Sequence, residues 1–198
     1  EHVLSQFGIE YSTEDGFYEA LRIMTLKGDF VALVHYKNGY IDDRNATELE
    51  GVDLLIGSSF IDLSKKIANS FNNKDNTRTQ TYFQEFSAIE PIVHAYCVKH
   101  NSGMPAHCYN GCKRLLQEYA KYNHADVIEW FENMHQELQQ AQVRLLNMRS
   151  VAFSKDRMSK MVDALVKKGA KELSVEPFVL GQHDKPVAWI LKFKKRTN

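Results

Sequence analysis

The segment SKDRMSKMVDALVKKGAKELSVEPFVLGQHDKPVAWILKF, residues 154–193, decides the fold class of this chain. Ser154 is a preferred helix N-cap, apolar residues follow it at helical spacing, and Gly169 is a natural helix stop. Residues 173–180 and 187–193 are rich in β-branched and aromatic side chains, and a polar loop joins them. This order predicts a helix followed by a β-hairpin, and therefore a C-terminal αββ unit.

Upstream of this unit, a regular stripe of apolar residues predicts a long amphipathic helix over 124–148. The stripe consists of Ile128, Phe131, Met134, Leu138, Ala141, Leu145 and Met148, spaced three and four residues apart. Such a stripe fits a helix that packs into the core of its own domain. It equally fits a seam for self-association or for a protein partner. The sequence leaves both interpretations open.

The first hundred residues mix helical and strand signals. Residues 12–28 and 60–71 have apolar positions at helical spacing. An apolar run over 30–41 contains Asn38-Gly39, which is typical of a tight turn, so we expect a β-hairpin there. Aromatic and β-branched residues at 81–104 favour two further strands.

These elements together predict an α+β fold. We expect an antiparallel sheet with packed helices, a long central amphipathic helix and the C-terminal αββ unit. The expected division is an acidic α+β domain over 1–110, a helical hairpin over 111–150 and a basic αββ unit over 151–198. One continuous domain is the alternative, because 198 residues also suit a single compact body.

The net charge of zero hides an uneven distribution. Residues 1–62 hold 12 acidic against 4 basic residues, a net of −8, whereas residues 150–198 hold 11 basic against 5 acidic, a net of +6. A basic end can meet the phosphates of a nucleic acid or an acidic protein, and the alternative is that the two ends neutralise each other. The candidate nucleic-acid-binding residues are Lys155, Arg157, Lys160, Lys167, Lys168, Lys185, Lys192, Lys194, Lys195 and Arg196.

All three cysteines lie close together in the sequence, among several histidines. Zinc takes four thiolate or imidazole ligands, and Cys97, His100, Cys108 and Cys112 form two close pairs around a Gly-Met-Pro turn. These four residues are a candidate structural zinc site. The alternative is that the cysteines are small buried apolar residues of the core.

A cysteine nucleophile is a further hypothesis. Cys108 precedes an expected helix, whose dipole would lower the pKa of the thiol. His183 could serve as the base and Asp184 lies beside it, which would make the protein a small cysteine hydrolase. No local motif supports this combination beyond the residue types.

Two family resemblances can be stated. The first rests on an apolar run at 30–36, Gly39-x-Ile41, Asn45-Ala46, Leu49-x-Gly51, Leu55-Ile56-Gly57 and Phe60. With these residues the segment 30–109 resembles a PAS sensor domain, and the hairpin expected at 92–109 would correspond to late strands of that family. The resemblance implies an α+β domain that binds a small ligand or a partner, signals through a following helix and dimerises.

The second resemblance concerns the C-terminal unit. A helix over 154–168 that ends in Lys-Lys-Gly, followed by a hairpin with a polar tip, is similar to the recognition helix and wing of winged-helix regulators. It implies that Lys155, Arg157 and Lys160 face a DNA groove and that His183 and Lys185 reach backbone phosphates. A plain αββ unit packed on the rest of the fold is the alternative.

Several function classes lack their sequence signatures. No apolar run reaches the roughly 18 residues of a membrane span, no signal peptide is visible, and phosphate-loop, dinucleotide-binding and zinc-protease motifs are missing. We therefore expect a cytoplasmic, non-enzymatic regulatory or binding protein that acts through protein–protein or small-ligand interaction, without contact to a membrane. The rival hypotheses are a nucleic-acid-binding protein stabilised by zinc, and a cysteine hydrolase.

Overall fold

The computed structural model describes residues 2–26, 28–181 and 183–195. Its contacts divide the chain into two compact units. The sheet unit combines 1–45 with 147–198, and the helical unit comprises 46–146. The α+β class is confirmed. The boundary expected near 110 lies inside the helical unit, and this unit ends at 146, close to the boundary expected near 150. The helical unit is inserted in the sequence between the two halves of the sheet unit.

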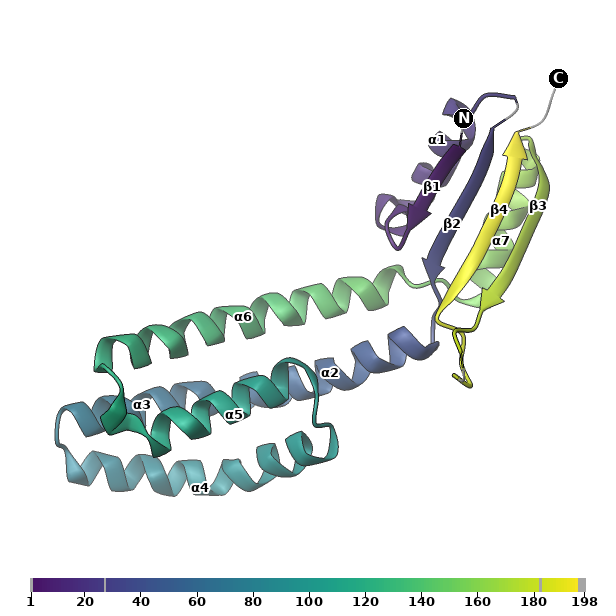
Figure 1. Ribbon diagram of the computed structural model, residues 1–198. Helices are drawn as coiled ribbons and strands as arrows, with labels where there is room; N and C mark the ends of the chain where they lie inside the picture. The colour runs from purple at the N-terminus through teal and green to yellow at the C-terminus, as the bar shows by residue number, and fades with distance from the viewer. Residues whose placement is uncertain (1, 27, 182, 196–198) are drawn as a thin grey trace. The chain divides into compact units, whose positions relative to one another are not determined.

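The sheet unit contains four strands and the helices that connect them (Figure 1). Its elements are β1 (His2–Gln6), η1 (Ile9–Ser12), α1 (Thr13–Ile23), β2 (Asp29–His35), α7 (Lys155–Lys167), β3 (Ala170–Phe178) and β4 (Ala188–Lys195). The strand order is β1-β2-β4-β3. The β1–β2 pair is parallel because α1 carries the chain back between them, and the other two pairs are antiparallel. The sheet is therefore mixed rather than purely antiparallel.

Helices α1 and α7 cover the same face of this sheet (Figure 1). Phe17 from α1 and Met158 from α7 are buried with Phe30 of β2 and Phe193 of β4, and the last two rings stack at 4.3 Å between centroids. The Ser154 hydroxyl accepts a hydrogen bond from the Arg157 N–H at 3.2 Å, which is the expected N-cap. The predicted αββ unit is thus confirmed, and it supplies half of the sheet.

The hairpin expected around Asn38-Gly39 is wrong, because this turn leads into a helix. Helix α2 (Tyr40–Gly57) begins directly after it. Gly39 is required at the turn, since a Cβ there would lie 2.3 Å from the Pro186 carbonyl oxygen. The Asp42 carboxylate in the first helical turn accepts the Asn38 N–H at 2.9 Å, an interaction that favours the helix start.

Asp42 makes the stability of the sheet unit depend on pH. Burial by itself would raise the pKa of this carboxyl, but hydrogen bonds from Asn38 and Arg149 and the charge of Lys37 lower the pKa below its ordinary 3.8. The contribution of Asp42 to the free energy of unfolding is thus complete above pH 3.8. It is lost as the pH falls from 3.8 through the lower pKa of the folded state. We expect the Asp42→Asn variant to have a lower free energy of unfolding at neutral pH. Below pH 3.8, its free energy of unfolding should change less with pH than that of the parent protein. Urea titrations at several pH values check this, with Asp163→Asn, an exposed carboxylate on α7 of the same unit, as the control.

The helical unit is built around five helices (Figure 1). It comprises the later part of α2, then α3 (Phe60–Asn72), α4 (Asn76–Lys99), α5 (Gly103–Gln117), η2 (Tyr119–Lys121) and most of α6 (His124–Val151). The apolar stripe predicted on α6 lies in the core: Phe131 and Ala141 are 0% exposed and Leu138 is 1% exposed. Burial within one chain accounts for this stripe.

The strands expected over 81–104 are wrong, because these residues belong mainly to α4 and the start of α5. Only Val93 and Cys97 of α4 are buried, while aromatic and β-branched residues such as Phe83 and Ile92 are exposed. When apolar residues also occupy solvent-facing positions, the helical spacing of apolar residues can no longer be seen in the sequence. The β propensity of aromatic and β-branched residues then favours the wrong prediction of strands.

Candidate functional site

A cavity suited to a small molecule lies inside the helical unit. Its volume is about 470 Å³, within the roughly 300–1,000 Å³ typical of small-molecule sites. We call it the helical pocket, and its lining residues are Phe60, Phe83, Phe86, Ser87, Glu90, Pro91, Tyr109, Lys113, Leu116 and Gln117. They come from α3, α4 and α5.

Helical periodicity places the lining residues of α4 on one face of that helix, and those of α5 on one face of the other. Residues 83, 86, 87, 90 and 91 follow one another at spacings that share a face of α4, and Tyr109, Lys113 and Leu116 do the same on α5. Phe60 contributes from α3, with its ring centroid 5.1 Å from that of Phe86 and 5.9 Å from that of Tyr109. The Phe60 ring thus packs against one ring from each of the other two helices.

Two polar groups of the pocket are joined. The Tyr109 hydroxyl donates a hydrogen bond of 2.5 Å to the Glu90 carboxylate. Burial, followed by the bond to Glu90 and its negative charge, raises the pKa of Tyr109. The phenol therefore stays protonated at neutral pH, remains a donor and occupies one oxygen of the carboxylate.

The pocket also has a cation. The Lys113 ammonium lies 5.8 Å from the centroid of the Tyr109 ring, and it forms no ion pair with any residue that the structure describes. Pro91 lies inside α4 and has no N–H to donate to the Ser87 carbonyl four residues earlier. Apolar walls with a few convergent polar groups are typical of sites for small organic molecules.

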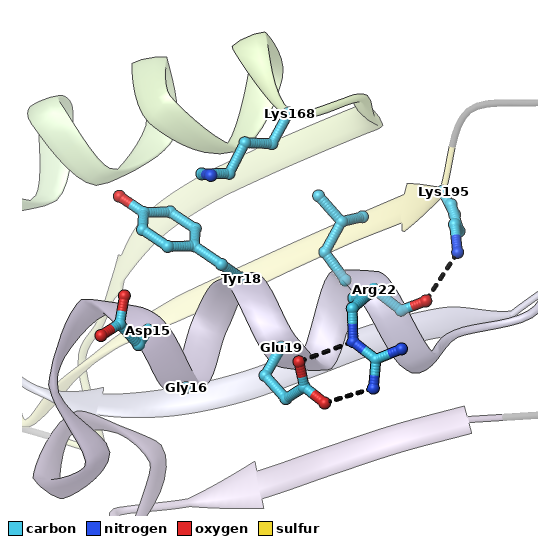
Figure 2. A pocket seen from close by; sticks show the side chains of 8 residues that line it. Asp15, Gly16, Tyr18, Glu19, Arg22, Lys168 and Lys195 are labelled. Carbon is cyan, nitrogen blue, oxygen red and sulfur yellow. Dashed lines mark hydrogen bonds and ion pairs between the residues drawn. The ribbon is translucent and has the colours of Figure 1, made fainter.

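A second cavity, of about 810 Å³, lies in the sheet unit beside α1 (Figure 2). Four of its five charged side chains, all but Asp15, make contacts within the protein. Arg22 donates two hydrogen bonds to Glu19, at 2.7 and 2.6 Å. The Lys195 ammonium donates to the Arg22 carbonyl at 2.8 Å, and the Lys168 ammonium lies over the Tyr18 ring at 4.5 Å. The helical pocket differs from this cavity in its wall of aromatic rings, which suits a small organic molecule.

The structure does not assemble the cysteine and histidine residues into a metal site. Cys97, Cys108 and Cys112 are buried thiols, and the Cys97 Sγ lies 3.6 Å from the Pro105 carbonyl oxygen. His100 packs its ring on Tyr96 instead, at 4.7 Å between centroids. In residues 2–26, 28–181 and 183–195, no group of three or more His, Cys, Asp or Glu side chains is placed to hold a metal. The structure matches the alternative of small buried core residues.

The pKa of Cys108 is raised, whereas a nucleophilic cysteine needs a lowered pKa. A hydrogen bond with Cys112 and burial raise it, and burial together with Cys108 raises the pKa of Cys97 to about 11. A protonated thiol is a weak nucleophile. His183 belongs to the sheet unit, where its ring stacks on Tyr40 at 4.0 Å.

The candidate nucleic-acid-binding residues fall into sets on opposite sides of the sheet. Lys155, Arg157 and Lys160 lie on α7, as do Lys167 and the adjoining Lys168, whereas Lys192 and Lys194 alternate with buried residues of β4. Lys192 and Lys194 lie on the face of the sheet that α1 and α7 leave uncovered, because the residues of β4 that alternate with them pack against those helices.

Several of these cations also have partners within the sheet unit. Lys194 pairs with Glu172 at 2.5 Å, Lys185 pairs with Asp43, and the Arg157 guanidinium lies 4.0 Å from the Phe153 ring centroid. Arg196 is outside the described residues. These contacts pair three of the candidate cations within the sheet unit.

A buried Glu–His pair in the sheet unit was not predicted from the sequence. The side chains of Glu10 and His35 are 0% and 7% exposed, and the Glu10 Oε1 lies 2.6 Å from His35 Nδ1 and 3.2 Å from the His35 main-chain nitrogen. Within the described part of the chain, Glu10 Oε2 is the buried side-chain oxygen without a hydrogen-bond partner. A separation of 25 residues gives no local signal for such a pair.

Comparisons with protein-family models, curated proteins and solved structures find no match to this chain. The resemblances to PAS and winged-helix domains therefore stay predictions. None of the helices that the structure describes is both long and apolar enough to cross a membrane. The assignment of function rests on the geometry of the sites.

Proposed function

We propose that this chain is a binding protein whose helical unit takes up a small, largely apolar organic molecule. The helical pocket carries this proposal. It has the volume of a ligand site, a wall of packed aromatic rings and polar groups at a few defined points. The role agrees with the small-ligand interaction expected from the sequence, and ligand uptake would regulate the protein.

The neutral fluorophore N-phenyl-1-naphthylamine is a suitable probe, because it has two aromatic ring systems and no charge. We expect saturable binding of one molecule per chain. We expect Ser87→Phe to weaken this binding by about tenfold or more, because the new ring occupies the space of the ligand. Fluorescence titration of the full chain measures both affinities.

Thr81→Phe is the matched control for this substitution. Ser87 and Thr81 lie on the same helix, both are exposed, and each hydroxyl donates to the carbonyl four residues earlier. Only Ser87 of the two lines the pocket. Equal loss of affinity in both variants, or unaltered affinity in Ser87→Phe, would contradict the proposal. Circular dichroism shows whether both variants keep the helical content of the parent protein.

A further inference from the structure

We infer that the helical pocket selects an amphipathic organic acid, and that Lys113 binds its anionic group. This inference rests on the proposed function and specifies the class of ligand. The apolar part would lie against Phe60, Phe83 and Phe86, and a single carboxylate or sulfonate would meet the ammonium group.

Lys113 is the basic side chain of the pocket lining, and Glu90 is the acidic one. The two are not equivalent toward a ligand. Glu90 already accepts the Tyr109 hydroxyl, whereas Lys113 has no ion-pair partner in the part of the chain that the structure describes. An anion would gain a charge-assisted hydrogen bond at Lys113 without displacing an ion-pair partner.

The position of Lys113 also disfavours cationic ligands. Aromatic walls can hold an ammonium group through cation–π contact, which would make a cationic ligand the main rival. Lys113 already lies over the Tyr109 ring at 5.8 Å, so a ligand cation at that ring would meet a like charge. An anion that meets the Lys113 ammonium itself, rather than the Tyr109 ring or the Glu90 carboxylate, is attracted instead.

Two probes with the same rings test this inference. 1-Anilinonaphthalene-8-sulfonate carries one negative charge, and N-phenyl-1-naphthylamine is the same molecule without the sulfonate. The quantity to measure is the ratio of the two affinities for the full chain at low ionic strength. We expect Lys113→Gln to lower this ratio by about tenfold, and Lys113→Arg to retain it, because arginine keeps the charge.

Lys66→Gln is the matched control. Lys66 also belongs to the helical unit, is exposed and lies 5.8 Å from an aromatic centroid, that of Tyr82, but it does not line the helical pocket. We expect this variant to keep the parent ratio. An equal fall in the Lys66 variant would show a general charge effect and overturn the inference.

The two proposals fail in different ways. If the parent protein binds neither probe, the proposed function is contradicted and the inference falls with it. If both probes bind and Lys113→Gln leaves their affinity ratio unchanged, the pocket binds ligands without an anion anchor, and only the inference is overturned.

Discussion

Phe131→Ala is expected to lower the free energy of unfolding of the helical unit by about 3–5 kcal/mol, the usual cost of removing a buried phenyl ring. Phe131 is 0% exposed and lies on α6 among the core residues of this unit. The loss combines the transfer free energy of the ring with the cavity that it leaves, because the surrounding helices relax only partly.

Trp130 makes this prediction measurable in one unit alone. The chain has 2 tryptophans, and Trp130 belongs to the helical unit while Trp189 belongs to the sheet unit. Urea unfolding followed by Trp130 fluorescence in a Trp189→Phe background therefore reports on the helical unit. Val143→Ala, on the same helix but 57% exposed, is the control and should change stability by less than about 0.5 kcal/mol. Equal effects of the two substitutions would show that the stripe on α6 is not buried.

Glu10→Ala is expected to destabilise the sheet unit by about 2–4 kcal/mol. The substitution removes the acceptor of both the His35 ring and the His35 main-chain N–H. Because this pair is buried, water cannot replace the lost carboxylate, and the remaining groups stay desolvated without a partner. Trp189 fluorescence in a Trp130→Phe background measures the effect.

Glu19→Ala provides the contrast in the same unit. Glu19 makes two hydrogen bonds to Arg22, but both side chains are more than half exposed, so water replaces the lost interaction. We expect little change in stability. A Glu10 variant as stable as the Glu19 variant would contradict the burial of the Glu10–His35 pair.

Much of the sheet unit could be predicted because its signals are local. Ser154 as a cap, Gly169 as a stop and alternating residues in the last strands all act within a few positions of the chain. The Asn38-Gly39 turn could likewise be recognised in the sequence, but its continuation into a helix could not. That continuation depends on Asp42, whose carboxylate is held by Arg149, 107 residues away.

The helical pocket could not be predicted, since its residues become neighbours only in the folded unit. Phe60, Glu90 and Lys113 come from three helices, and no spacing in the sequence joins them. The helix α4, which forms one wall, was itself mistaken for strands. The Cys/His cluster was conspicuous in sequence because its members are close together, yet folding turns its cysteines into core residues.

The proposal that the helical unit binds a small apolar molecule is tested most directly by amide chemical-shift mapping during a titration with N-phenyl-1-naphthylamine. We expect the saturable shifts to cluster at residues 83–91 of α4 and 109–117 of α5, together with Phe60. Shifts confined to the sheet unit, or no saturable shifts at all, would contradict it.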